Sequence, residues 1–323
     1  MTGSRDRIVL VAGELHELSG RHPEWPGGRE TLFLQPGTDL PARDDVDAII
    51  PLVSQRVGEN ELAGLPSLRV ISNYGVGYDN IELGAAARRG VIVTNTPDVL
   101  TDATADLAMA LLLAAARRLR EGLDLARSGG WKGWHPTQLL GMGLQGRVLG
   151  LLGAGRIGAA TARRAVAFGM EIAYWNRTAA PELEAKIGAR RIVDLEALLA
   201  EADAVSVHLP LTRETRGLLD RGHLEAMKTG AILVNTARGA IVDQGALEEA
   251  LRTGHLAAAG LDVFENEPDI PAGLRELPNC LVLPHLGSAT REARQAMWDL
   301  AAANVRAVLA GKQPISRVEL PAG

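Results

Sequence analysis

Cysteine is almost absent from this sequence, and long apolar runs are missing altogether. The single cysteine, Cys280, excludes an internal disulfide framework and a metal site built from several thiolates of this chain. No segment approaches the roughly 18 uninterrupted apolar residues of a membrane-spanning helix. The apolar run near the N-terminus is also too short for a signal-peptide core. We therefore expect a cytoplasmic protein with no membrane partner.

An excess of basic residues is also lacking. Lys and Arg total 34 against 39 Asp and Glu, and the net charge is -5. Because the basic residues form no runs, we expect no nucleic-acid partner. The H-E-x-x-H and G-x-S-x-G patterns are absent too, so we expect neither a metal site nor serine-hydrolase chemistry.

The first hundred residues alternate short β-rich segments with short helix-forming segments. The strand-like segments, rich in Ile and Val and bounded by turn residues, are residues 7–11, 48–51, 69–73 and 91–95. Helix-forming segments with glycine near their ends occupy residues 59–65 and 80–90. This alternation predicts a small, flavodoxin-like parallel α/β domain.

A second and larger α/β series follows. Residues 101–126 predict one long connecting helix, and the Trp- and Gly-rich residues 128–146 predict an extended excursion. From Arg147 onward, seven strand-like segments interleaved with helices predict a doubly wound parallel sheet. Residues 288–312 predict a last helix, with Ser288 or Thr290 as its N-cap.

The sequence GAGRIG, which begins at Gly153, fits the G-x-G-x-x-G pattern between a predicted strand and a predicted helix. In such a turn Gly153 permits the tight bend, Gly155 permits close approach of a pyrophosphate, and Gly158 permits close packing of the helix. The helix start, with Arg156 and Ile157, would direct free N–H groups toward the phosphates. A glycine-rich turn without a ligand, and a solvated Arg156, are the alternatives.

The acid that pairs with the ribose of NAD is missing after the next predicted strand, where Asn176, Arg177 and Thr178 stand. An amide at Asn176 removes the repulsion between a carboxylate and a 2′-phosphate. Arg177 and Thr178 supply a charged fork and a hydroxyl suited to phosphate oxygens. We therefore expect NADPH as the preferred cofactor, with NAD possible. Alternatively, Arg177 points to solvent and the site takes either cofactor.

Three polar residues lie at the carboxyl ends of late predicted strands, where an open α/β sheet binds its ligands: Arg238, Glu267 and His285. Together they suit hydride transfer to a 2-oxo acid. Arg238 can hold the substrate carboxylate with its fork. His285 can donate the proton, and a carboxylate such as Glu267 would favour the protonated ring. Individually they also read as a loop arginine, a turn acid and a helix-capping histidine.

These motifs resemble those of the D-2-hydroxyacid dehydrogenase family, in the family's order and over nearly the whole chain. The matching segments are YGVGYDNI, GAGRIG, HLPLTRETRGL, NTARGAIVD, GLDVFENEP and PHLGSAT. The resemblance implies that Arg238, Glu267 and His285 form the catalytic set. It also implies that the amides of Val76 and Gly77 bind the substrate carboxylate.

The resemblance further implies a set of cofactor contacts and a domain arrangement. Asp262 is expected to orient the nicotinamide carboxamide, and the other implied contacts are Thr104, Pro210, Thr215, Ala237 and Gly287. The dinucleotide-binding domain is expected at residues 99–286. The substrate-binding domain is then discontinuous, from residues 1–98 and 287–323.

Within the family the chain is most similar to glyoxylate and hydroxypyruvate reductases, through its GGWKGWHP and NRT segments. This similarity implies a homodimer, in which Trp134 enters the partner's active site or only packs the interface. Leu52 and Trp134 would set the pocket size, so a larger 2-oxo acid such as 2-ketogluconate remains an alternative substrate. A non-catalytic dinucleotide-sensing protein that shares the fold is the other alternative.

Overall fold

The structure is a computed structural model that describes residues 7–20 and 23–321. The chain divides into two compact units. One unit comprises Met1–Leu100 and Ala289–Gly323, and the other comprises Thr101–Ser288. Each contains one parallel β-sheet with helices on both of its faces, which confirms the predicted α/β class. Both boundaries lie two residues beyond the limits expected from the sequence. Among the described residues no helix is both long and apolar enough to cross a membrane.

The sheet of the first unit has the strand order β2-β1-β3-β4-β5, with every pair parallel. Its strands are β1 (Ile8–Val11), β2 (Glu30–Phe33), β3 (Val46–Ile50), β4 (Val70–Ser72) and β5 (Ile92–Thr94). This is the flavodoxin-like order. The sequence did not predict β2, because this edge strand alternates exposed and half-buried residues and lacks the apolar run of a central strand.

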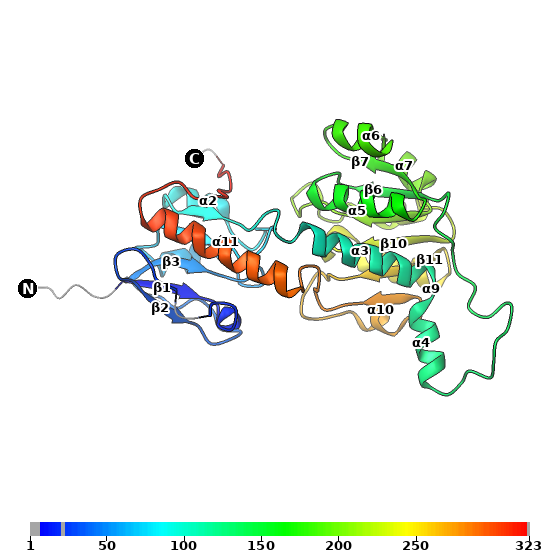
Figure 1. Cartoon of the computed structure of the whole chain (residues 1–323), viewed down its shortest axis with the longest axis horizontal. Helices are drawn as coiled ribbons and strands as arrows, with labels where there is room; N and C mark the ends of the chain where they lie inside the picture. The colour runs from blue at the N-terminus through cyan, green and yellow to red at the C-terminus, as the bar shows by residue number, and fades with distance from the viewer. Residues whose placement is uncertain (1–6, 21–22, 322–323) are drawn as a thin grey trace, which may run out of the picture. The chain divides into compact units, whose positions relative to one another are not determined.

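Helices cover both faces of this sheet (Figure 1). They are the 3₁₀ turn η1 (Gly13–Leu15), α1 (Glu59–Ala63), α2 (Leu83–Arg88) and α11 (Arg291–Leu309). The last of these, α11, packs against β3 and β4 although it lies some 200 residues further along the chain. Its N-cap is Thr290, whose hydroxyl accepts a hydrogen bond from the Ala293 N–H at 3.1 Å, so Ser288 is not the cap.

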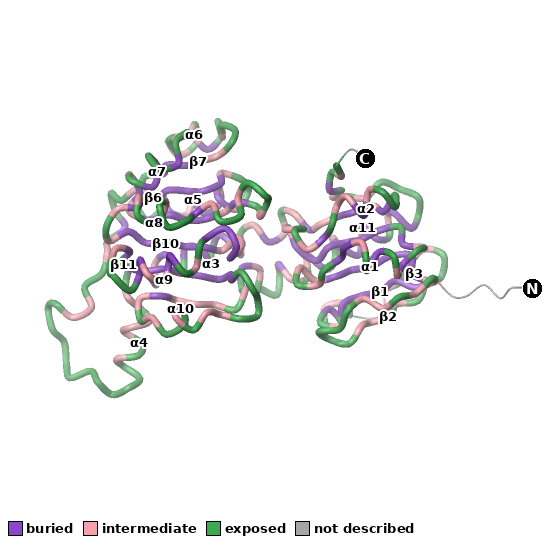
Figure 2. The backbone as a smooth tube through the Cα atoms, turned by 180° about the vertical axis from the view of Figure 1, so that it is seen from behind, coloured by how far each residue is buried: buried purple, intermediate pink, exposed green. Residues whose placement is uncertain are grey.

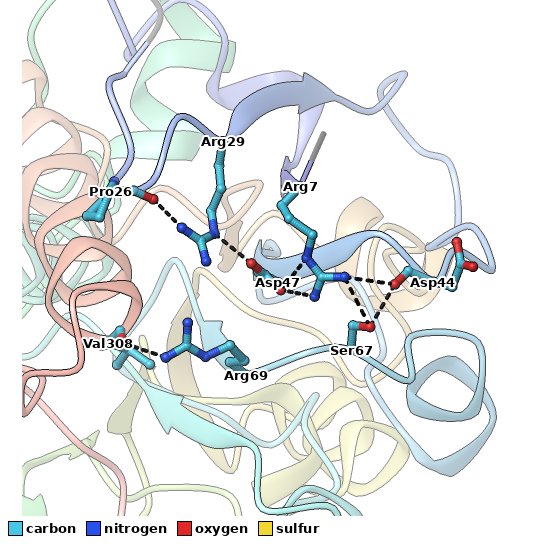
Figure 3. A network of polar contacts seen from close by, with 8 residues as sticks. All are labelled: Arg7, Pro26, Arg29, Asp44, Asp47, Ser67, Arg69 and Val308. Carbon is cyan, nitrogen blue, oxygen red and sulfur yellow. Dashed lines mark hydrogen bonds and ion pairs between the residues drawn. The ribbon is translucent and has the colours of Figure 1, made fainter. Parts of the chain in front are cut away.

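A buried carboxylate, Asp47 on β3, links two arginines of neighbouring segments (Figure 3). The Arg29 Nε donates to Asp47 Oδ2 at 2.6 Å, and the Arg7 Nε donates to Oδ1 at 2.9 Å. Burial opposes ionisation of Asp47, but the two guanidinium groups outweigh it and hold the pKa of that carboxyl below its usual range. The carboxylate is therefore ionised and paired at neutral pH.

We expect Asp47→Asn to lower the free energy of unfolding of this unit by about 3 kcal/mol, because two arginines lose a buried partner. The matched control Glu82→Gln removes an exposed acid 3.7 Å from Arg88, and it should cost under about 0.5 kcal/mol. Because the folded-state pKa of Asp47 is lowered, its contribution is complete at neutral pH and lost as the pH falls below about 4. Urea unfolding at two pH values measures both effects, and equal midpoints for the two variants at pH 7 would contradict the expectation.

The sheet of the second unit has the order β12-β11-β10-β9-β6-β7-β8, again wholly parallel. Its strands are β6 (Val148–Leu152), β7 (Glu171–Trp175), β8 (Arg190–Arg191), β9 (Ala204–Val207), β10 (Ala231–Asn235), β11 (Leu256–Leu261) and β12 (Cys280–Val282). All seven predicted strands are present. The order reverses at β6, between β7 and β9, and such a switch point is where doubly wound sheets bind ligands.

Two layers of helices enclose this second sheet. One layer packs α3 (Thr101–Ala116) and α5 (Arg156–Ala167) on one face, and the other packs α7 (Leu195–Glu201), α8 (Arg221–Ala226) and α9 (Gln244–Arg252) on the opposite face. The remaining elements are α4 (Leu119–Arg127), α6 (Pro181–Ile187), the 3₁₀ turn η2 (Gly239–Ile241) and α10 (Ala272–Glu276). Each layer completes an apolar core with its face of the sheet.

The single long helix predicted for residues 101–126 is wrong, because the chain breaks between α3 and α4. Arg118 adopts a left-handed conformation (φ 53°). The Ala116 carbonyl at the end of α3 accepts the Met142 N–H at 2.8 Å instead of continuing the helical pattern. Beyond α4, which buries no residue, residues 128–146 form the predicted excursion and are largely exposed (Figure 2).

Candidate active site

The glycine-rich turn joins β6 to α5, as the sequence predicts. Gly153 has a φ of +100°, which favours glycine, and Gly155 is the N-cap of α5. A Cβ on Gly158 would lie 2.1 Å from the Gly153 carbonyl oxygen, so only glycine allows the helix to start this close to the strand. A Cβ on Gly155 would meet none of the described atoms within 4 Å. The turn thus offers open space above a helix N-terminus, which fits a dinucleotide pyrophosphate.

Two alanine substitutions in this turn should separate folding from cofactor binding. We expect Gly158→Ala to destabilise the unit by at least about 2 kcal/mol, because its methyl group overlaps backbone atoms. Gly155→Ala should leave the melting temperature nearly unchanged but weaken NADPH binding at least about tenfold, because its methyl group enters the phosphate space. Thermal melts and fluorescence titration measure the two effects. Normal NADPH affinity in the Gly155 variant would contradict the placement of the pyrophosphate.

A neutral histidine lies beneath this turn. The carbonyl oxygen of His208 would be 2.8 Å from a Cβ on Gly153, and the His208 Nε2 lies 2.9 Å from the Ser206 hydroxyl. Burial lowers the pKa of His208 to about 4, so the ring carries no charge at neutral pH. Positive potential at the turn therefore comes from the N-terminus of α5 and from the exposed Arg156, and not from this imidazole.

The NRT segment forms a compact turn directly after β7. The Asn176 side-chain amide donates to the Thr178 carbonyl at 3.0 Å, which closes the turn on itself. Arg177 and Thr178 are exposed. Sequence reasoning missed a fourth residue, Arg191 on β8, whose guanidinium donates to the carbonyls of Asn176 and Arg177. No signal in the sequence marks Arg191, because it is the observed strand pairing that sets it opposite Tyr174.

The three candidate catalytic residues follow three adjacent strands. Arg238 follows β10 and is the N-cap of η2, Glu267 follows β11, and His285 follows β12. Gly239 allows η2 to touch the segment after β11, since a Cβ there would lie 2.0 Å from the Phe264 carbonyl carbon. Parallel strands end at one edge of the sheet, so these residues come together there.

Glu267 and His285 form a direct pair. The His285 Nδ1 lies 2.7 Å from Glu267 Oε2, and the other carboxylate oxygen accepts the Phe264 N–H at 3.0 Å. Half-burial opposes ionisation, but the His285 ring, the Phe264 N–H and the charge of Arg238 together lower the pKa of Glu267. An ionised Glu267 fixes the ring orientation through Nδ1, so Nε2 is the nitrogen available for substrate.

Asp262 holds the backbone that carries His285. Its fully buried carboxylate accepts the Leu286 N–H at 2.7 Å and the Gly287 N–H at 2.8 Å, and its own carbonyl accepts the His285 N–H. His285 itself has a left-handed φ of 55°. Burial raises the pKa of Asp262, against the two backbone donors that lower it. Thr104 on α3 completes this corner, 3.4 Å from a Cβ on Gly287.

The other predicted contact residues lie in ordered turns. Thr215 donates to the Pro210 carbonyl at 2.7 Å, after β9, and the Ala237 N–H donates to the Asn235 side chain at 3.0 Å, after β10. In the other unit, Leu52, Val76 and Gly77 lie in loops that follow its strands. Trp134 lies in the excursion and is 83% exposed in this chain.

Comparison with known proteins identifies the family. The sequence model of one protein family, the NAD-binding domain of the D-isomer specific 2-hydroxyacid dehydrogenases, matches residues 109–287. The chain belongs to this family. A glyoxylate reductase of Thermococcus litoralis is 52% identical over 274 residues, which cover 84% of this chain and 82% of that protein. A glyoxylate reductase of Pyrococcus furiosus is 49% identical over 274 residues, which cover 84% of this chain and 81% of that protein.

A solved structure shows the same fold. It is the NADPH-dependent glyoxylate/hydroxypyruvate reductase of Sinorhizobium meliloti in complex with NADP and malonate, which is 36% identical, covers 97% of both chains and has a TM-score of 0.87. Membership of the family makes the chain an NAD(P)-dependent oxidoreductase of 2-hydroxy acids. The matched domain contains the glycine turn, the NRT turn and the Arg238, Glu267 and His285 cluster.

Proposed function

We propose that this dehydrogenase reduces a small 2-oxo acid, glyoxylate or hydroxypyruvate, with NADPH. The observation that carries the proposal is the 2.7 Å pair of His285 and Glu267, next to Arg238 at the edge of a dinucleotide-binding sheet. The curated relatives named glyoxylate reductase support the substrate class. Asn176, Arg177 and Thr178, which replace the ribose-binding acid, support the choice of NADPH.

The cluster supplies the two groups that the reduction needs. The nicotinamide supplies the hydride when it is bound. Arg238 holds the substrate carboxylate with its guanidinium fork and polarises the carbonyl. Protonated His285 donates from Nε2 to the oxygen that becomes the hydroxyl, while Glu267 at Nδ1 stabilises the imidazolium. Asp262 keeps the His285 turn in place, and it would help to orient the carboxamide of the cofactor next to that turn.

The unit that contains Leu52, Val76 and Gly77 serves as the substrate-binding domain in this proposal. Side-chain amides hold its loop from behind: Asn95 donates to the Val76 carbonyl at 2.9 Å, and Asn73 donates to the Gly77 carbonyl at 2.7 Å. The Val76 carbonyl shares a trans peptide with the Gly77 N–H, which therefore points away from Asn95. In this proposal the N–H groups of Val76 and Gly77 bind the substrate carboxylate. Leu52 limits the size of the substrate side chain.

We also propose a homodimer. Large apolar side chains are exposed along α4 and the excursion: Leu119, Leu123, Trp131, Trp134 and Leu140. Apolar side chains gathered on one protruding segment are typical of a protein interface. In the dimer, Trp134 reaches the partner's active site and contributes to the choice of substrate.

A substrate panel tests the proposed function. Purified protein is given NADPH with glyoxylate, hydroxypyruvate or 2-ketogluconate, and kcat/KM is compared among them. We expect glyoxylate or hydroxypyruvate to lead by at least about tenfold. A lead for 2-ketogluconate would replace the substrate but keep the reaction, whereas tight NADPH binding with no turnover of any acid would indicate a dinucleotide sensor.

A further inference from the structure

Arg191 contacts the middle of the NRT turn, although it lies 13 residues beyond Thr178. Pairing of β7 with β8 sets Arg191 opposite Tyr174, one strand away from the turn. One nitrogen of its guanidinium donates to the Asn176 carbonyl at 3.0 Å and to the Arg177 carbonyl at 2.7 Å. Two consecutive carbonyls of the turn therefore face the same cation.

Other contacts fix the rest of the turn. The Asn176 side chain donates to the Thr178 carbonyl, and the Ala180 N–H donates to the Tyr174 hydroxyl at 2.7 Å. That hydroxyl in turn donates to Glu184 on α6. The turn is thus held at both ends, and Arg191 holds its middle.

The direction of these bonds favours an anion on the outer side of the turn. In a trans peptide the carbonyl and the N–H point in opposite directions. Because the carbonyls of Asn176 and Arg177 point at Arg191, the N–H groups of Arg177 and Thr178 point away from it. The Arg177 side chain and the Thr178 hydroxyl lie on the same exposed turn. Successive backbone donors of this kind form an anion-binding concavity.

The charge of Arg191 is also available to such an anion. In the described part of the chain Arg191 forms no ion pair with a carboxylate, and its buried Nε has no hydrogen-bond partner. The exposed Glu214 is an acid that senses the turn: its pKa is lowered by hydrogen bonds of its own loop, foremost with Thr212, and by the charges of Arg213 and Arg177. Glu184 on α6 is held by the Tyr174 hydroxyl and not by Arg191.

We propose that Arg191 is a positioning residue that determines the preference for NADPH. It locks the NRT turn in the anion-binding form and adds a second positive charge near the 2′-phosphate. This inference rests on the proposed preference for NADPH. Without Arg191 the two carbonyls are free to rotate toward the ligand, where their partial negative charge opposes a phosphate.

Binding of two cofactor fragments tests this proposal without catalysis. Calorimetry compares 2′-phospho-ADP-ribose with ADP-ribose for the wild type, Arg191→Gln and Arg191→Lys. We expect Arg191→Gln to weaken binding of the 2′-phosphate fragment about tenfold, since charge-assisted hydrogen bonds are lost, and to change ADP-ribose binding less than about twofold. Arg191→Lys keeps the charge without the planar fork, so its loss should be intermediate.

The neighbouring residue provides a matched control. Arg190 lies on the same short strand, is exposed and pairs with Glu201. Successive side chains of a strand point to opposite faces, so Arg190→Gln should leave both fragment affinities unchanged. Normal ADP-ribose binding in each variant shows that the domain is folded.

The outcomes separate the two levels of the proposal. A wild type that binds both fragments equally would overturn the preference for NADPH and the role of Arg191 together. If the wild type prefers the 2′-phosphate fragment and Arg191→Gln shows the same preference, only the role of Arg191 is overturned. An equal loss for both fragments would assign Arg191 to the general integrity of the turn, which also contradicts the proposal.

Discussion

Replacement of His285 by alanine should lower kcat for 2-oxo acid reduction by about 10³-fold, within the range that a positioned general acid contributes. The reason is local. Glu267 holds Nδ1 at 2.7 Å, and removal of the ring takes away both this contact and the Nε2 donor. The dissociation constant for NADPH should stay within about threefold of the wild type, because the turn that we propose for the pyrophosphate follows a different strand, β6. Steady-state kinetics and fluorescence titration measure the two quantities.

The chain offers a matched control for this substitution. His223 on α8 forms a similar pair, with its Nδ1 2.7 Å from Asp220 Oδ1. This pair lies at the N-terminus of α8, where Asp220 is the N-cap. His223→Ala should therefore leave kcat near the wild-type value. A His285→Ala variant that kept more than a tenth of the wild-type kcat would contradict the assignment of the proton donor.

Replacement of Arg238 by lysine should lower kcat/KM for the 2-oxo acid by about 10²-fold, although the charge is kept. A lysine presents a point charge and cannot reproduce the two parallel donors that a guanidinium offers to a carboxylate. The backbone around Arg238 is fixed by the Asn235 side chain, which donates to the Arg238 carbonyl at 2.9 Å, so the variant should fold normally. Most of the loss should appear in KM, because the clamp acts on the bound substrate as well as on the transition state.

Arg221→Lys is the matched control for the clamp. Arg221 is an exposed arginine on α8 that pairs with Glu249 at 2.8 Å. Its replacement should change kcat/KM by less than about twofold, because a surface pair contributes little. Near-normal kinetics in Arg238→Lys would show that no fork is needed at this position.

The fold was predictable wherever burial on both faces of a sheet required apolar segments. The central strands of both sheets, such as β3 and β10, are buried along their whole length, and the sequence shows them as Ile- and Val-rich runs. The edge strand β2 and the break at Arg118 leave no such pattern. Each depends on a contact with another segment of the chain. Strand β2 forms by pairing with β1, and α3 ends where the Met142 N–H bonds to the Ala116 carbonyl.

The sequence located the main parts of the candidate site but not all of the contacts within it. Arg238, Glu267 and His285 were identified because each follows a predicted strand, and parallel strands bring their carboxyl ends to one edge. The sequence also located the NRT turn, but it gave Asn176 only an electrostatic role. In the structure the Asn176 amide also closes the turn. An Asn176→Asp substitution therefore adds a charge and removes a hydrogen-bond donor together.

Arg191 shows why the sequence did not predict the rest of the candidate site. No motif marks it, and its neighbour Arg190 has the same side chain but a different partner, Glu201. Which of the two faces the turn depends on the register between β7 and β8. A register shift of one residue would exchange them, and a two-residue edge strand does not reveal its register in the sequence.

The most direct test of the central claim is the rate of NADPH oxidation when glyoxylate is added to the purified wild-type protein at neutral pH. We expect one NADPH to be consumed for each glyoxylate reduced, with a kcat/KM for NADPH at least about tenfold above that for NADH. Consumption of neither cofactor, with glyoxylate or with any other small 2-oxo acid, would contradict the account.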